Sequence, residues 1–276
     1  MQTRHLADLV RFQRMRTEEL RRAFLVEDLF ARDEVRLVYW EAERTIVGSA
    51  VPTGGALRLP VPPELAADCF AARREIGVMN LGAPGLVTVD GQRHELGPRD
   101  ALYVGRGARE VEFTSASPTT PALFYLVSHP AHATHPTARL TPAEAETVRL
   151  GSPENASERV LRRYIHSGGV QSCQLVMGAT DVVAGSVWNT MPPHTHARRT
   201  EIYLYFDLDP AQAVFHFMGP PESTRHLVVR NLQVVLSPSW SMHFAAGTAR
   251  YAFVWSMGGE NQEFADMDGV ELSRLL

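Results

Sequence analysis

The amino-acid sequence predicts an all-β protein with minor helices, built from two copies of one β-barrel or jelly-roll unit. The first observation is a series of short, evenly spaced segments rich in Val, Ile, Tyr and Phe, which Gly, Pro and Asp separate. Such segments are typical of strands, and many short strands in a row are typical of barrels and sandwiches. The second observation is an internal repeat, in which 96–113 aligns with 236–253 at an offset of 140 residues.

One amphipathic helix is expected ahead of the strands. The run "TEEL" at 17–20 provides a capping Thr and two acidic residues, and apolar residues follow at helical spacing up to Leu29. The strands expected in the first barrel are 34–40, 44–51, 75–82, 85–91, 101–105, 109–115 and 122–128.

The chain between the two barrels differs in composition. Residues 129–155 are rich in Pro, Ala, Thr and Glu, which predicts a linker with a short helix after Thr141. Strands are expected again at 172–178, 201–208, 213–219, 226–231, 232–237 and 250–259. We therefore expect an N-terminal barrel with its leading helix at 1–128, a linker at 129–155 and a C-terminal barrel at 156–276.

Composition excludes several classes of function. The 276 residues are 45% hydrophobic, which is enough for a sizeable core, and the net charge of −4 arises from interspersed acids and bases. A nucleic-acid partner is therefore not expected, and neither is a polybasic membrane patch. Cys69 and Cys173 are the only cysteines and have no C-x-x-C spacing, so no disulfide framework or thiolate metal cluster is expected. The N-terminus has no uninterrupted apolar segment, which predicts a cytoplasmic protein.

The repeat assigns any metal site to one half of the chain. At the offset of 140 it matches Leu96 with Leu236, Pro98 with Pro238, Gly107 with Gly247 and Phe113 with Phe253. Tyr103 then falls opposite His243, and the first half contains no H-x-H motif. Only the C-terminal copy is expected to hold a metal.

The candidate ligands are His194 and His196 in "HTH", followed by Glu201 and the remote His243. Residues i and i+2 of an extended chain share a face, and imidazole nitrogen with carboxylate oxygen suits zinc and similar ions. Alternation in "EIYLYF" places Glu201, Tyr203 and Tyr205 on one face. An isolated H-x-H is also common among solvated or core histidines, but the added Glu and the remote His match the two-part signature of cupin barrels.

Two residues depart from the usual cupin signature, and a second group of histidines offers another possible metal site. Trp240 stands where cupins usually have glycine, and Gly247 stands where they often have asparagine. A second group of histidines, His129, His132 and His135, lies in the Pro-rich segment, and we interpret it as part of a solvated loop rather than as a second metal site.

Longer runs resemble one family across essentially the whole chain. They include "RREIGVMNLG", "VDGQRHELGPRDALYVGRGAREV", "WNTMPPHTHARRTEIYLYFDL", "MGPPESTRH" and "GENQEFADMD". These runs are similar to the bacterial 5-keto-4-deoxyuronate isomerases of pectin breakdown. The resemblance implies a two-cupin fold, a hexameric homo-oligomer, and one Zn²⁺ per chain held by His194, His196, Glu201 and His243.

The resemblance also implies a reaction and a small-molecule substrate. The family converts 4-deoxy-L-threo-5-hexosulose uronate into 3-deoxy-D-glycero-2,5-hexodiulosonate, which moves a carbonyl from C1 to C2. This requires a proton to leave C2 and another to reach C1. Glu201 and a metal-bound water are the candidate bases, and Tyr203, Tyr205 and His226 are candidate proton relays. Four protein ligands are typical of a structural zinc, so either the ion expands its coordination or Glu201 loosens during turnover.

The substrate's carboxylate needs a cationic partner, and a guanidinium fork matches two carboxylate oxygens. The candidates for this role are Arg163, Arg199 and Arg225. Gln174 is a further candidate pocket donor, and Trp188 and Trp240 are candidate pocket walls, with core packing as the alternative for both tryptophans.

Two other classes of function stay open at this point. A cupin dioxygenase would use similar ligands with a redox-active ion such as iron. A binding or storage cupin would hold a structural metal and would turn over no uronate.

Overall fold

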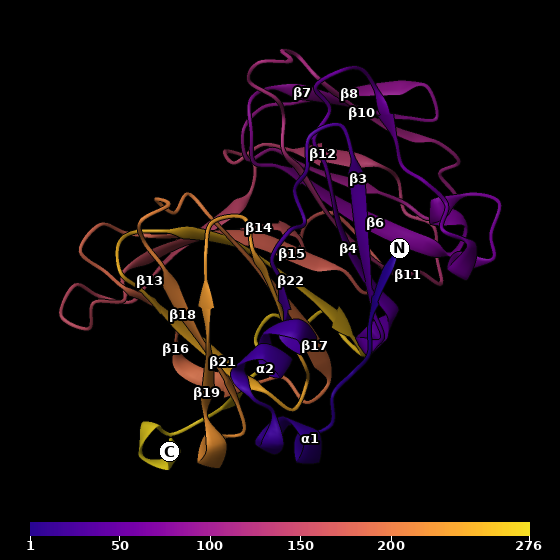
Figure 1. The fold of residues 1–276 in the computed structure, drawn as a ribbon. Coiled ribbons are helices and arrows are strands. Elements are labelled where there is room, and N and C mark those ends of the chain that lie inside the picture. Colours follow the sequence, from indigo (N-terminus) through magenta and orange to yellow (C-terminus); the bar gives the residue numbers. More distant parts are fainter. The chain divides into compact units, whose positions relative to one another are not determined.

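The computed structural model describes residues 1–276, which form two compact units (Figure 1). The first unit comprises Met1–Arg4, Asp28–Ala145 and Tyr164–Val176, and the second comprises His5–Glu27, Glu146–Arg163 and Met177–Leu276. Strands dominate both units, which confirms the predicted all-β class. No helix has the length and apolar character needed to cross a membrane.

The first unit contains two sheets, and their buried side chains form a core around Phe113 and Phe124. The seven-stranded sheet has the order β1 (Gln2–Arg4), β3 (Val35–Trp40), β4 (Thr45–Ala50), β11 (Phe124–Pro130), β6 (Arg74–Asn80), β9 (Ala101–Val104) and β12 (Ala138–Leu140). The four-stranded sheet has the order β5 (Leu57–Arg58), β10 (Val111–Ser115), β7 (Gly85–Val89) and β8 (Gln92–Leu96).

The second unit repeats this plan. Its seven-stranded sheet has the order β13 (Glu146–Leu150), β14 (Arg159–Ile165), β15 (Val176–Val182), β22 (Ala252–Gly259), β17 (Arg199–Phe206), β20 (Val234–Ser237) and β2 (Leu25–Val26). Its five-stranded sheet, drawn largely in orange in Figure 1, has the order β19 (Arg225–Val229), β18 (Val214–Gly219), β21 (Met242–Gly247), β16 (Trp188–Thr195) and β23 (Asp268–Gly269).

The leading segment forms two helices, α1 (Leu9–Arg14) and α2 (Thr17–Phe24). The carboxylate of Glu19 accepts a hydrogen bond from the backbone N–H of Arg16, which stabilises the start of α2. The predicted helix ends before Leu29 because Leu25 and Val26 extend into β2 and pair with β20. Single turns of 3₁₀ helix also occur at η1 (Ala42–Arg44), η2 (Pro63–Leu65), η3 (Phe70–Arg73), η4 (Pro221–Ser223) and η5 (Leu272–Arg274).

The observed units differ from the boundaries expected from composition. Both leading helices belong to the second unit rather than the first, because Leu20 and Phe24 are buried there. The segment expected to be a linker, 129–155, contains the end of β11 together with β12 and β13. No helix forms after Thr141, whose backbone N–H instead donates to the carboxylate of Glu144 over 2.8 Å, within a turn.

The internal repeat is present, but the offset of 140 aligns the wrong strands. The matching sheet orders make β6 the counterpart of β17 and β9 the counterpart of β20. Val104 pairs with Ile76 just as Ser237 pairs with Glu201. Ile76 of the first unit therefore corresponds to Glu201, and Tyr103 is not the counterpart of His243. An apolar residue replaces the carboxylate, which explains why only the second unit has a candidate metal cluster.

The carboxylate of Glu75 is fully buried in the first unit. It accepts the backbone N–H groups of Cys173, Gln174 and Leu175 over 2.7–2.8 Å, and the hydroxyl of Tyr103 over 2.8 Å. Four donors offset the loss of hydration that burial of a carboxylate would otherwise cost. Glu75 thereby holds the segment that follows Tyr164 to the rest of this unit.

His129 lies in β11 and is fully buried, so the interpretation of this residue as part of a solvated loop is wrong. Its Nδ1 lies 3.3 Å from the hydroxyl of Thr45, and its Nε2 has no hydrogen-bond partner. Burial, with a contribution from nearby Arg74, lowers the pKa of His129 to about 3. His132 is exposed, as expected for a loop.

We expect His129 to make the first unit sensitive to acid. The unfolded chain binds a proton at this residue near its ordinary pKa of about 6.5, whereas the folded chain does not until about pH 3. Its contribution to stability is therefore complete above pH 6.5 and is lost at about 1.4 kcal/mol per pH unit as the pH falls further. His129→Gln should flatten the dependence of the urea unfolding midpoint on pH between 6 and 4.5. His132→Gln is the matched control, and an unchanged slope in the His129 variant would contradict the expectation.

Candidate metal centre and its pocket

Four side chains from three strands and one turn converge in the second unit. His194 lies near the end of β16, His196 lies in the turn that follows, Glu201 lies on β17 and His243 lies on β21. The register places His194 directly opposite His243. A register shift in β16 between Asn189 and His194 re-aims the end of this strand, as bulges beside functional sites often do. The local H-x-H motif and the remote histidine thus reach one point.

The converging atoms have the geometry of a metal site. One ligand atom from each residue lies within 4.8 Å of the others. The carboxylate Oε2 of Glu201 lies 3.0 Å from Nε2 of His196 and 2.9 Å from Nε2 of His243. Nε2 of His194 lies 3.1 Å from Nε2 of His196. The short contact between Nε2 of His243 and Glu201 does not have hydrogen-bond geometry, so this buried nitrogen makes no hydrogen bond and its lone pair can bind an ion. The residues present therefore fit a divalent ion.

The opposite ring nitrogens fix two of these histidines in the state that binds metal. Nδ1 of His196 lies 2.9 Å from the backbone carbonyl of Asp266, which can only accept, and 3.2 Å from Nη2 of Arg199, which can only donate. The shorter contact favours a proton on Nδ1, which leaves Nε2 free to bind. Nδ1 of His243 lies 3.1 Å from the hydroxyl of Ser237, which can accept its proton in the same way. Nδ1 of His194 has a weaker contact, 3.4 Å, with the carbonyl of Pro192.

The charges of the cluster also suit a cation. Burial, together with neighbouring His243, lowers the pKa of His194 to about 3, and burial lowers the pKa of His243. Burial by itself would raise the pKa of Glu201, but His243 and His196 outweigh it and hold this pKa well below its ordinary value. Deprotonated imidazoles and an ionised carboxylate are the forms that bind metal at neutral pH.

The cluster forms part of the wall of a pocket of about 210 Å³ that lies within the second unit. His194, His196, Glu201 and Tyr203 supply a polar wall, and Arg159 supplies a cationic group. Most of the remaining wall is apolar, as is common for small-molecule sites. The apolar wall is made by Leu150, Leu161, Met191, Pro192, Phe253, Trp255, Met257, Phe264 and Met267.

A sequence profile of the KduI/IolB family matches residues 24–272. The chain belongs to the KduI/IolB family. Among its curated relatives, a protein of Kineococcus radiotolerans is 54% identical over 265 residues, which cover 95% of each chain. A protein of Caldicellulosiruptor bescii is 46% identical over 275 residues and the full length of both chains. Both relatives are named 4-deoxy-L-threo-5-hexosulose-uronate ketol-isomerase.

Solved structures share the fold of this KduI/IolB chain. An IolB-like protein from Salmonella typhimurium superposes with a TM-score of 0.73 at 14% identity, covering 90% of this chain and 96% of its own. The oxalate decarboxylase of Lactobacillus farciminis, solved as a formate complex, superposes with a TM-score of 0.62 at 9% identity, covering 91% and 89%. At such low identities these structures establish the two-cupin fold alone, which confirms the predicted architecture.

The three candidate proton relays lie in different surroundings. Tyr203 lines the pocket, and its ring centre lies 5.3 Å from that of His243. Burial and the charge of Glu201 raise the pKa of Tyr203 well above its ordinary value, so it stays a protonated donor. The hydroxyl of Tyr205 lies 2.7 Å from Nδ1 of His216, behind the pocket wall. His226 is exposed between Phe215 and Phe217, so it cannot relay protons at this pocket.

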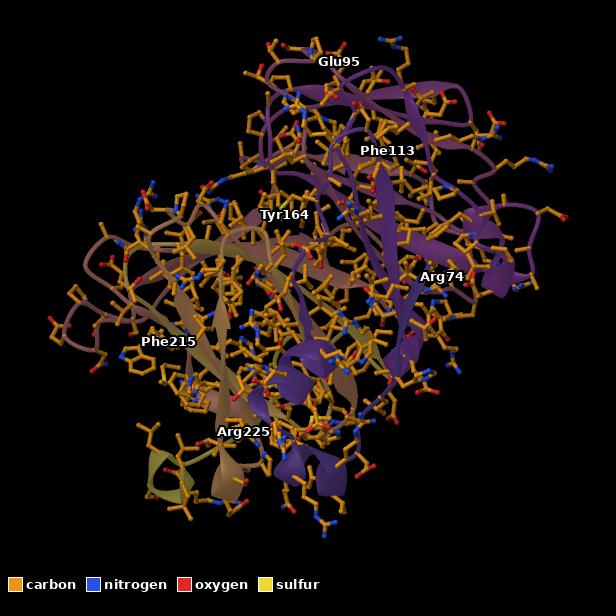
Figure 2. The ribbon with its side chains drawn as sticks, in the orientation of Figure 1. Arg74, Glu95, Phe113, Tyr164, Phe215 and Arg225 are labelled. Carbon is orange, nitrogen blue, oxygen red and sulfur yellow. The ribbon has the colours of Figure 1, made fainter.

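None of the three arginines named from the sequence lines the pocket. Arg163 forms an ion pair with Glu146. Arg225, at the start of β19 in Figure 2, donates to the carbonyl of Met15 and ties this strand to the leading helices. Arg199 is fully buried beside the cluster, where it donates to the carbonyl of Asp266 over 2.6 Å. Arg199 therefore supports the carbonyl that orients His196.

The remaining candidate substrate contacts also lie outside the pocket. Trp188 packs on Phe217 and Phe244, and Trp240 packs on Phe12 and Phe24 of the leading helices. Both tryptophans are partly buried and pack on other aromatic side chains, as the alternative noted for them expects. Gln174 belongs to the first unit, where its amide donates to the carbonyl of Pro130 over 2.8 Å.

Sequence reasoning missed three residues that matter here, namely Arg159, Ser237 and Asp266. Arg159 opens β14, a strand that was not expected from composition. Ser237 could have been found, because it directly precedes Pro238, which lies five residues before His243 in the sequence. Asp266 acts through its backbone carbonyl, which no side-chain pattern reveals. Its carboxylate is held by the guanidinium of Arg198 over 2.8–2.9 Å and by Asn261 over 2.6 Å, so the carbonyl has a fixed place.

Loss of the Ser237 hydroxyl should weaken metal binding without removing a ligand. In Ser237→Ala, Nδ1 of His243 loses the hydroxyl that it contacts over 3.1 Å, so its imidazole is held less firmly in the tautomer that binds metal. We expect the affinity for added Zn²⁺ to fall about tenfold to a hundredfold, measured by competition with a chelator. Ser256→Ala is the matched control, because the buried hydroxyl of Ser256 has no partner to lose. Equal affinities in the two variants would show that Ser237 does not orient His243.

Proposed function

We propose that this chain is an aldose–ketose isomerase that converts 4-deoxy-L-threo-5-hexosulose uronate into 3-deoxy-D-glycero-2,5-hexodiulosonate. The supporting observation is the cluster of three histidines and Glu201, of which His194, His196 and Glu201 line a small pocket. The chain's curated isomerase relatives are 46–54% identical over 94% or more of its length. The substrate is a small acidic sugar, which a pocket of about 210 Å³ suits.

Zinc is the proposed ion. Three imidazole nitrogens and one carboxylate oxygen form a donor set that zinc accepts, and the second unit contains no cysteine that would favour a thiolate site. His194, His196, Glu201 and His243 would hold the ion. When bound, the ion would act as a Lewis acid for the negative charge that develops on the two oxygens of the reacting carbons.

Glu201 is the proposed proton carrier between C2 and C1. It is an ionised carboxylate, 6% exposed, on the pocket wall, and no other carboxylate lines the pocket. Glu201 takes the proton from C2, and the C–H electron pair becomes the C1–C2 double bond of an enediolate. The same carboxyl group then returns the proton to C1, and the hydroxyl proton of the C2 oxygen passes to the C1 oxygen, which leaves a carbonyl at C2 and a hydroxyl at C1. Tyr203 lies beside Glu201 as a protonated donor for an oxygen of the intermediate.

The function is tested by elemental analysis of the purified protein, combined with an assay on the keto-deoxyuronate that is formed from pectin lyase products. We expect about one zinc per chain, loss of turnover on chelation, and recovery when zinc is returned. Two metals per chain would contradict the single site. Oxygen consumption with bound iron would favour the dioxygenase alternative, and a metal-loaded protein without turnover would favour a binding cupin.

Exchange of the carboxylate for an amide separates the two roles of Glu201. If Glu201 only holds the ion, Glu201→Gln should lose activity in proportion to lost zinc and recover in excess zinc. If it carries the proton, turnover should fall on the order of a hundredfold or more with the site full, because an amide does not titrate. We expect the second result, whereas His243→Ala should mainly lose metal. Near-normal turnover of a zinc-loaded Glu201→Gln enzyme would exclude Glu201 as the base and favour metal-bound water.

Assembly and location complete the proposal. We propose a homo-oligomer, a hexamer by the family resemblance. Partly exposed Trp188, Phe215 and Phe217 on the five-stranded sheet support it, because aromatic side chains are enriched in subunit contacts. A monomer by light scattering at micromolar concentration would contradict it. A cytoplasmic location fits the two free cysteines, which are typical of reducing compartments.

A further inference from the structure

Arg159 is the only lysine or arginine that lines the pocket of the metal cluster. It is the first residue of β14 and is 9% exposed. Leu161, two residues further on, also lines the pocket, as expected for the alternate residues of a strand. A guanidinium is thus held in the same small space as His194, His196 and Glu201.

The positive charge of Arg159 has no anionic partner in the protein. Its two Nη atoms donate to the carbonyls of Ser157 over 2.9 Å and Met191 over 3.2 Å, and no carboxylate forms an ion pair with it. Its neighbours on β14 differ, since Arg162 pairs with Asp181 and Arg163 pairs with Glu146. Burial lowers the pKa of Arg159 accordingly. A buried cation without a counter-ion is costly, and an anionic ligand would offset that cost.

The two carbonyl contacts also fix the direction of the guanidinium. Met191 lies on β16, three residues before His194, and itself lines the pocket. The strand that presents the first histidine of the cluster therefore holds one end of Arg159 as well. The guanidinium is positioned before any ligand arrives, which reduces the entropy that binding must overcome.

We propose that Arg159 binds the carboxylate of the substrate and makes the pocket specific for acidic sugars; this proposal rests on the proposed isomerase function. The acid end of the open-chain sugar lies at Arg159, and the carbonyl and hydroxyl of the reacting carbons lie at the metal cluster. The apolar walls, among them Leu161, Trp255 and Phe264, have no hydrogen bonds to offer a misplaced carboxylate. One fixed cation therefore sets which end of the substrate meets Glu201.

The test compares three variants of the zinc-loaded full-length protein. Arg159→Met removes the charge at similar volume, and Arg159→Lys keeps the charge but loses the planar fork. Arg162→Met is the matched control, because Arg162 is the next arginine on β14 and its ion pair with Asp181 lies outside the pocket. Steady-state kinetics on the keto-deoxyuronate are measured with zinc content and melting temperature. We expect Arg159→Met to lower kcat/KM about a hundredfold or more, mainly through KM, with zinc retained.

A binding measurement independent of turnover accompanies the kinetics. D-galactonate and galactitol are matched open-chain probes that differ by one carboxylate, and calorimetry gives their affinities for each variant. We expect the wild-type protein to bind galactonate at least tenfold more tightly than galactitol. Arg159→Met should abolish this preference, Arg159→Lys should retain part of it, and Arg162→Met should retain all of it.

The outcomes separate this proposal from the proposed function. The role of Arg159 would be overturned if Arg159→Lys and Arg159→Met both kept the wild-type KM and the full preference for galactonate. The proposed isomerase function would then still stand. If Arg159→Met does not fold, an unchanged galactonate affinity in Arg159→Lys overturns it, and a tenfold loss supports it. The wild-type protein could also turn over no uronate and still bind galactonate in a way that depends on Arg159. That result would overturn the proposed isomerase function but support the proposed carboxylate site.

Discussion

A buried charge needs either an opposite charge or a set of hydrogen bonds, and both units are organised around this requirement. In the first unit the carboxylate of Glu75 is met by three backbone N–H groups and the hydroxyl of Tyr103. Each of its oxygens is satisfied by the protein itself, so the group stabilises one conformation and has no capacity for chemistry. In the second unit the carboxylate of Glu201 faces two imidazoles whose outer nitrogens are already engaged. The carboxylate and the inner imidazole nitrogens converge on one point, and this arrangement suits a cation.

The same fold therefore meets the requirements of a buried carboxylate in two ways. Glu75 has a structural role, and Glu201 has a functional one. One difference lies at a matched register position, where Ile76 in β6 corresponds to Glu201 in β17, and another is that the first half contains no H-x-H motif. An apolar side chain at that point makes the first barrel an ordinary core. A carboxylate at that point requires histidines around it, and these in turn require Ser237 and the carbonyl of Asp266 to fix their protons. The carboxylate of Glu201 thus depends on a series of further contacts around it.

The ligand cluster could be predicted from the sequence because its parts are local. His194, His196 and Glu201 lie within eight residues on either side of one turn, and alternation along a strand fixes their faces. His226 could have been excluded by the same rule, since Leu227 and Val229 are buried and place it on the outer face. The repeat offset failed because Leu, Pro and Gly recur at many turns, so identity there does not distinguish one strand from the next.

Other features depend on contacts that a linear pattern does not contain. Trp240 was expected near the substrate, but two helices more than 200 residues away in the chain cover it. Arg159 was not considered, because the strand that it opens pairs at its edge with a segment expected to be a linker. A pocket is a property of side chains that meet across several strands, so its lining becomes visible only when the strand order is known.

The leading segment has a consequence for how the protein is made. Residues 5–27 belong to the second unit, where Leu25 pairs with Val235 and the guanidinium of Arg21 reaches the carbonyl of Val228. During synthesis these residues emerge more than 200 residues before their partners. Contacts of such large sequence separation form slowly, and the apolar side chains of α2 stay uncovered on the nascent chain in the meantime. The metal-binding barrel is therefore completed only after β20 has been made, and until then its helices are a surface that chaperones can bind.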